Sequence, residues 1–210
     1  MERSQEEEVI NAATHFIASI GSLLAAFLVL FLKDLHPRLT VPIILISSCS
    51  AWTFFSSYLY HSSKNKLDHF RNRVVDKTAI YLMISGSGCA LSLVVSNPYF
   101  GMISCFTILI FSSFFIAKLC TQKEMSESAS IASYVLLGWL SFMPATGLLF
   151  KTPITEGASF TLGIIGSLFY SIGVVFYVSD TRKWFHTIWH ILVMAGFGFH
   201  FTALVIVDIS

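Results

Sequence analysis

Charged residues are scarce in this sequence. They make up 12% of the 210 residues, whereas 55% are hydrophobic and the mean hydropathy is +0.73. A soluble domain carries roughly 25% charged residues because its surface must be hydrated. The composition therefore excludes an ordinary soluble domain and indicates a protein whose solvent is lipid, an integral multi-pass membrane protein.

Basic excess and paired cysteines are also missing. The formal net charge is only +1, so nucleic acid is not an expected partner. The cysteines stand singly, without CxxC or CxxxC spacing, and indicate neither a disulfide framework nor a thiolate metal site. We interpret all four as small buried hydrophobic residues: Cys49, Cys89, Cys105 and Cys120.

Long apolar segments separate the clusters of charge. Each is long enough to cross a hydrocarbon core of ~30 Å, which takes about 20 helical residues. Backbone groups in lipid must be hydrogen-bonded internally, and the period-two alternation of a barrel is absent, so helices are expected. The sequence predicts an all-α membrane protein, a seven-transmembrane helix bundle that forms one domain over 1–210. The predicted spans are 9–32, 39–63, 78–96, 99–117, 128–150, 157–179 and 184–207.

The boundary between the third and fourth spans depends on one turn. Forty uncharged residues lie between Lys77 and Lys118, too many for a single span. Asn97-Pro98 is the strong helix breaker within them. Two spans are therefore predicted there.

Basic residues predict the orientation. Short loops rich in Lys and Arg stay cytoplasmic, and ten of the thirteen such residues fall on one face of the predicted bundle. We therefore expect a cytoplasmic N-terminus and a C-terminus on the opposite side. The residues before the first apolar segment are acidic, unlike a signal peptide, so this segment is expected to remain as a span.

Polar residues within the spans gather at one predicted depth. His186 and His190 are four residues apart and share one face of the last helix. Ser57 and His61 have the same spacing at the end of the second span, and Asp76 precedes the third. All five are expected at the cytoplasmic side.

Three imidazoles without a fourth protein ligand are typical of a catalytic zinc site, whose open position holds a water with a pKa lowered to ~7. The predicted metal ligands are His61, His186 and His190. Asp76 is predicted to accept a proton from this water or to orient it, and Ser57 to hydrogen-bond the water or a developing oxyanion.

Simpler interpretations of these residues remain open. Histidines near a membrane interface often bond carbonyls or lipid headgroups. Ser57 has a second interpretation, a hydrogen bond to a carbonyl of its own helix. Asp76 has one as well, as the N-cap of the third helix.

Other polar residues are expected to brace the bundle. Glu8, Asn11 and His15 form an i, i+3, i+7 stripe on the first helix, with direct metal ligation by His15 the lesser alternative. His200 lies about 15 Å beyond His190 along the helix, too far to share the site, so packing or a headgroup contact is expected. Small residues of the sixth span are expected to permit close helix packing. These are Gly163, Gly166 and Gly173.

Several motifs occur together in one order. They are Glu8-x-x-Asn11-x-x-Thr14-His15, Ser57-x-x-x-His61, Asp76 followed by Ala79-Ile80-Tyr81, Gly138-Trp139, and His186-x-x-x-His190. This pattern resembles the hemolysin III proteins and the progestin and adiponectin receptors. The resemblance implies a seven-helix fold with a cytoplasmic N-terminus and zinc held by His61, His186 and His190, with Asp76 and Ser57 beside the metal-bound water. Lys77 departs from the pattern, because hemolysin III proteins usually have His there.

Three functions follow as hypotheses. The wider superfamily includes alkaline ceramidases, which suggests a zinc-dependent hydrolase of a lipid amide such as ceramide, drawn from the surrounding bilayer. The second is a membrane receptor or sensor with structural zinc. The third is a hemolysin-type membrane-lytic protein, although no segment reads as a soluble amphipathic helix that inserts after secretion.

Overall fold

The fold is all-helical in a computed structural model that describes residues 4–32, 36–94, 98–121, 126–143 and 154–207. No strand occurs in these ranges. The helices are α1 (Gln5–Leu32), the short 3-10 helix η1 (Pro37–Leu39), α2 (Thr40–His61), α3 (Lys66–Leu93), α4 (Pro98–Thr121), α5 (Glu127–Phe142), α6 (Ile154–Val178) and α7 (Phe185–Ile206).

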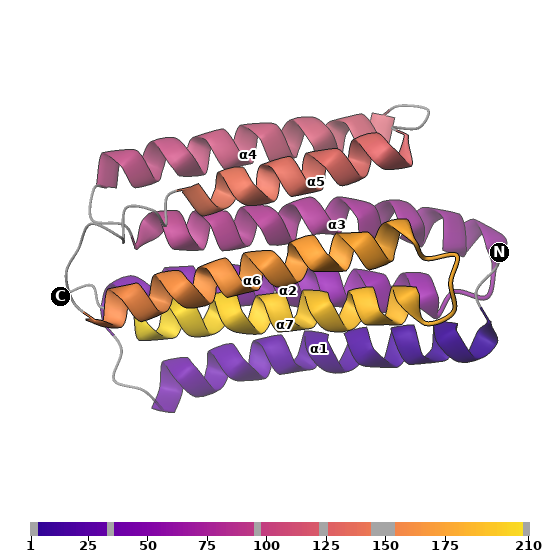
Figure 1. Cartoon of the computed structure of the whole chain (residues 1–210), viewed down its shortest axis with the longest axis horizontal. Helices are drawn as coiled ribbons and strands as arrows, with labels where there is room; N and C mark the ends of the chain where they lie inside the picture. Colours follow the sequence, from indigo (N-terminus) through magenta and orange to yellow (C-terminus); the bar gives the residue numbers. More distant parts are fainter. Residues whose placement is uncertain (1–3, 33–35, 95–97, 122–125, 144–153, 208–210) are drawn as a thin grey trace.

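The seven α-helices run along a common axis (Figure 1). α7 lies among α1, α2 and α6, while α4 and α5 cover the far side of α3. α1, α3, α5 and α7 all begin at one end of the bundle. We call it the basic end because eight of the nine Lys and Arg residues in the described ranges belong to the opening turns of α3, the last turn of α4 or the connections at that end. They are Lys64, Lys66, Arg71, Arg73, Lys77, Lys118, Arg182 and Lys183.

Five of the helical segments are long and apolar enough to cross a membrane. They are α1, η1 with α2, α4, α6 and α7. Large apolar side chains such as Phe31 and Tyr99 are more than 70% exposed, as expected for a surface solvated by lipid tails. The predicted membrane location agrees with this surface, while the count of seven spans and their orientation remain predictions.

The third helix begins earlier than predicted. Residues 64–77 were expected to form a polar loop, yet α3 begins at Lys66, where the Asn65 side chain accepts a hydrogen bond of 2.9 Å from the Leu67 N–H. Residues 66–77 contain neither Gly nor Pro, so nothing interrupts the helix outside the apolar segment. Asp76 therefore lies ten residues inside α3, and its interpretation as an N-cap is wrong.

Other boundaries follow the predictions more closely. α3 ends at Leu93 and α4 begins at Pro98, so two helices form on either side of the predicted boundary at Asn97-Pro98. Residues 95–97 lie outside the described residues. α5 ends at Phe142, and 144–150 of the predicted fifth span also lie outside them. The interpretation of all four cysteines as buried is wrong: Cys89 is buried, Cys49 and Cys105 are half-buried, and Cys120 is exposed on α4.

Glycines allow α6 to approach α7 closely, as predicted. A Cβ atom at Gly173 would lie 2.7 Å from the Trp189 ring, and one at Gly166 would overlap the His200 ring. A side chain at either position would push the helices apart. This packing fixes the position of α7, which carries two of the predicted metal ligands.

Candidate metal centre

Three histidines converge near the basic end of the bundle. His61 is the last residue of α2, whereas His186 and His190 lie in the first two turns of α7. One ring nitrogen from each lies within 4.8 Å of the others. All three are buried, with 6%, 5% and 1% of the residue exposed, respectively. The structure thus brings the three predicted ligands together.

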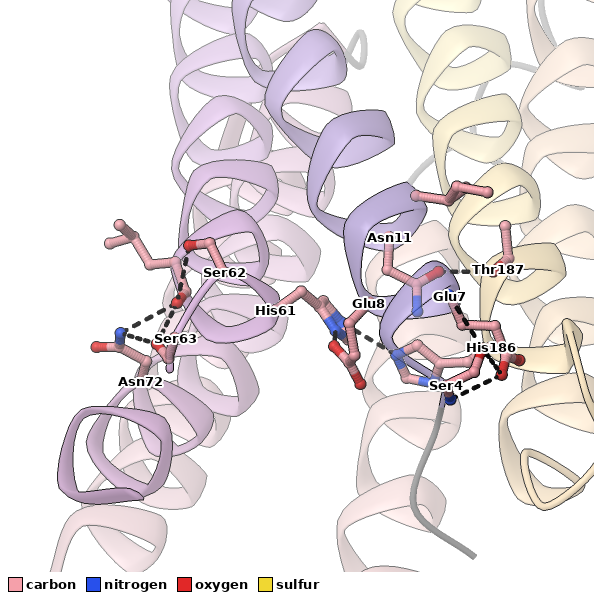
Figure 2. A network of polar contacts seen from close by, with 12 residues as sticks. Ser4, Glu7, Glu8, Asn11, His61, Ser62, Ser63, Asn72, His186 and Thr187 are labelled. Atoms are coloured by element: carbon pink, nitrogen blue, oxygen red, sulfur yellow. Dashed lines mark hydrogen bonds and ion pairs between the residues drawn. The ribbon is translucent and has the colours of Figure 1, made fainter. Parts of the chain in front are cut away.

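Carboxylates contact the Nδ1 atoms of two of these rings. Glu8 Oε2 lies 2.6 Å from His61 Nδ1 (Figure 2), and Asp180 Oδ2 lies 3.5 Å from His186 Nδ1. An ionised carboxylate only accepts hydrogen bonds, so the short Glu8 contact places the proton of a neutral His61 ring on Nδ1. Nε2 of His61 then carries the lone pair that a metal ion needs, and the Asp180 carboxylate favours the same tautomer in His186.

These two Nε2 atoms face each other at 3.3 Å (Figure 2). At this distance one ring donates a hydrogen bond to the other, or two lone pairs face each other and a cation between them removes their repulsion. Two nitrogens bound tetrahedrally at 2.0–2.1 Å to zinc are themselves ~3.3 Å apart. The donor chemistry and spacing therefore fit a metal ion that prefers imidazole ligands.

Helix α1 braces this cluster with the predicted stripe. Glu8 contacts His61, as above. Asn11 Oδ1 accepts a hydrogen bond of 2.7 Å from the hydroxyl of Thr187, the neighbour of His186. The His15 ring stacks on the His190 ring, with centroids 3.6 Å apart and planes 9° apart. The stripe thus contacts the histidine-bearing ends of both α2 and α7.

Glu7 ties the start of α7 to the start of α1. The Ser4 hydroxyl accepts from the Glu7 N–H at 3.2 Å, and Glu7 Oε2 accepts from the Ser4 N–H at 3.1 Å. Glu7 Oε1 also accepts from the Trp184 N–H at 2.6 Å, where Trp184 has a left-handed backbone with φ of 70°. The predictions missed Glu7, although the spacing Ser-x-x-Glu is a known capping signal.

The end of α2 is held by the Asn72 side chain of α3. The Asn72 amide donates to the Leu59 carbonyl at 3.1 Å and to the Ser63 hydroxyl at 2.8 Å, as Figure 2 shows. These bonds join the first turns of α3 to the last turn of α2. They fix the chain on both sides of His61, because Ser63 lies two residues beyond it.

Ser57 and Asp76 line the same cavity of about 420 Å³ as His186 and His190. Ser57 is 3% exposed and lies one turn before His61. Its neighbour Ser56 donates back to the Trp52 carbonyl at 2.7 Å and does not line the cavity. Asp76 is half-buried and lines the cavity from α3.

A charged cluster around Glu127 lies at this cavity. Glu127 Oε2 is 3.0 Å from Lys77 Nζ and 3.3 Å from Arg73 Nη2, and Oε1 accepts from the Tyr177 hydroxyl at 2.6 Å. Burial tends to raise the pKa of Glu127, but the Tyr177 hydrogen bond and the two cations together lower it. Lys77, the departure from the family pattern, thus joins α3 to α5.

A second, apolar cavity of about 110 Å³ adjoins the first. Thr53, Ile80, Trp189 and Val193 line both cavities. The second cavity extends among α3, α5, α6 and α7 as far as His200. The two cavities therefore lie side by side, one at the histidines and the other in the apolar middle of the bundle.

His200 packs inside the bundle, which was one of its two predicted roles. Its Nε2 lies 3.1 Å from the Gly163 carbonyl and 3.3 Å from the Ser167 hydroxyl, and the residue is 6% exposed. It is not part of the three-histidine cluster. Asp180 was not predicted as a site residue. The connection before α7 was used only to predict orientation, from its basic residues Arg182 and Lys183.

The fold and the site define an integral membrane protein with a buried three-histidine centre. Residues 3–201 match the family described as haemolysin-III related, and the chain belongs to that family. It is 28% identical to the hemolysin-3 homolog of Bacillus subtilis (strain 168), covering 91% of this chain and 89% of that protein. It is 25% identical to hemolysin-3 of Bacillus cereus, covering 91% and 87%.

Proposed function

We propose that this protein is a zinc-dependent hydrolase of lipid amides such as ceramide, with zinc held by His61, His186 and His190. The observation that carries the proposal is the 3.3 Å approach of the His61 and His186 Nε2 atoms beside a polar cavity. Three nitrogen ligands leave a fourth position for water or substrate, as in catalytic rather than structural zinc sites. When bound, zinc would supply a Lewis acid and lower the pKa of a coordinated water.

Asp76 and Ser57 take the proposed catalytic roles. Asp76 would act as the general base and return the proton to the leaving amine, because its half-buried carboxylate lines the histidine cavity. Ser57 would donate its hydroxyl to the developing oxyanion. Both residues approach the cavity from helices other than α7, so substrate would lie between α2, α3 and α7.

The two adjoining cavities favour an amphiphilic substrate. A polar head with a hydrolysable amide would occupy the larger cavity beside the histidines, and an acyl chain would enter the apolar cavity through the shared Ile80 and Val193. We place the basic end in the cytoplasm by the positive-inside rule, so the lipid would come from the cytoplasmic leaflet.

Detergent-purified protein tests the chemistry directly. We expect about one zinc per chain and release of free fatty acid from ceramide-like lipids. Asp76→Asn should abolish this release while zinc is retained, whereas Asp68→Asn, on the exposed face of the same helix, should leave it unchanged. Ser57→Ala should slow release by ~10², the effect of one oxyanion donor. Ser56→Ala is the matched control, because its hydroxyl bonds its own helix.

The other functions appear as distinct outcomes of this experiment. Full zinc occupancy with no product from a broad panel of lipid amides and esters would favour a receptor or sensor with structural zinc. Leakage of dye from lipid vesicles without hydrolysis, unchanged by Asp76→Asn, would favour a lytic protein. Absence of zinc from the wild-type protein would contradict the hydrolase proposal.

A further inference from the structure

His15 differs from the other histidines near the centre in how it is held. It is 4% exposed and lies on α1, between the Phe54 ring of α2 and the His190 ring of α7. Neither of its ring nitrogens has a hydrogen-bond partner in the described structure, and both are shielded from solvent. The closest described contacts of His15 are therefore those through the faces of its ring.

The contact with His190 is the closest ring stack around the centre. The two imidazoles are nearly parallel, with planes 9° apart and centroids 3.6 Å apart. Phe54 supports the arrangement at 5.1 Å from His15 and is itself packed edge-on against Phe197 at 5.9 Å. Since Phe54 is fully buried, His15 cannot retreat from His190 without disturbing the core.

We propose that His15 is a positioning residue that fixes the plane of the His190 imidazole by stacking, and thereby sets the affinity and geometry of the metal centre. This rests on the proposed function, in which His190 is a zinc ligand. A ligand ring that carries positive charge from a bound metal is also stabilised by an aromatic face. Direct ligation by His15 is not part of the proposal, because the ring nitrogens that lie within 4.8 Å of one another belong to His61, His186 and His190.

Three variants test this assignment, with zinc affinity measured by chelator competition and ligand geometry by the visible spectrum of the cobalt-substituted protein. His15→Phe keeps a ring against His190, so zinc affinity and the cobalt spectrum should stay close to wild type. His15→Ala should lower zinc affinity about tenfold, the lower end of the effect of outer residues on metal sites, and should alter the cobalt bands.

Ser19→Ala provides the matched control. Ser19 is buried one turn further along α1 and donates to the Ala51 carbonyl at 2.9 Å, so its loss weakens α1–α2 packing without touching His190. It should lower the thermal midpoint of the metal-free protein but leave the cobalt spectrum unchanged.

Each other outcome overturns the assignment in a recognisable way. Wild-type affinity and spectrum in His15→Ala would show that stacking does not position His190. Loss of zinc in His15→Phe would show that His15 is a ligand. If the wild-type protein binds no metal, both this inference and the proposed function fail, whereas a zinc-loaded wild type with an unaffected His15→Ala contradicts this inference alone.

Discussion

Glu8 Oε2 lies 2.6 Å from His61 Nδ1, although the two residues are 53 positions apart and on different helices. A carboxylate in this position fixes the tautomer of a ligating imidazole and raises its basicity, and the loss of such a partner typically lowers metal affinity 10–100-fold. We expect about this loss of zinc affinity in Glu8→Gln, measured by chelator competition. Asp180→Asn should have a smaller effect, because its carboxylate is 3.5 Å from His186.

Glu6→Gln is the control for both variants. Glu6 is 67% exposed on the same turn of α1, and its carboxylate lies 3.7 Å from the Lys183 ammonium. The zinc affinity of the Glu6→Gln protein should match that of the wild type. An equal loss in Glu6→Gln would indicate that the general negative charge of this helix end, rather than the Glu8 contact, determines the affinity.

The ligand set makes a second prediction. Replacement of His61, His186 or His190 by Ala should remove most of the bound zinc, measured by elemental analysis of the purified protein. His200→Ala should keep zinc near the wild-type level, but should lower the thermal midpoint because it opens a cavity against Gly166. Zinc loss from His200→Ala equal to that of the other variants would contradict the location of the centre.

The lowered pKa of Glu127 leads to a prediction of how the stability of the fold depends on pH. Its pKa is lowered in the folded protein, so the bonds to Tyr177 and Lys77 stabilise the fold above the unfolded pKa of the carboxyl. This contribution is lost as pH falls through the folded pKa. The thermal midpoint of the wild type should therefore drop more than that of Glu127→Gln when the pH is lowered from 7 to well below 4.5, the ordinary pKa of a Glu carboxyl. Because the Glu127 side chain is 46% exposed, the difference should be small and should shrink further in high salt.

The orientation of the chain is open to a simple reporter experiment. Most basic side chains of the described ranges lie at the end of the bundle where α1 begins, and α7 ends at the opposite end (Figure 1). A reporter fused after Ser210 should therefore lie outside the cytosol, and one fused before Met1 inside it. A cytosolic signal from the C-terminal fusion would reverse the proposed leaflet from which substrate enters.

Some of this architecture follows from the sequence and some does not. Charge clusters bound the apolar segments, so six of the seven predicted spans begin within about four residues of the observed helices. The start of α3 was wrong by twelve residues because apolar length marks the membrane and not the end of a helix. Residues 66–77 are polar and still helical.

The candidate metal centre could also be predicted from the sequence only in part. His61, His186 and His190 could be grouped from the sequence because alternating spans bring the end of one helix beside the start of another. Asp180 could not, since its approach to His186 depends on the turn before α7. That turn includes Trp184 in a left-handed conformation, which is uncommon for a non-glycine residue and is held here by the Glu7 carboxylate.

His61 and His186, whose Nε2 atoms meet at 3.3 Å, are separated by 125 residues of chain. During synthesis, α2 is complete before α7 exists. His61 and Glu8 are therefore made before His186 and His190, with the four helices α3 to α6 between them. The three-histidine centre therefore needs α7 docked against α1 and α2. A truncated or misinserted chain would lack the centre, so under the proposed function its bound zinc would report that the final helix is in place.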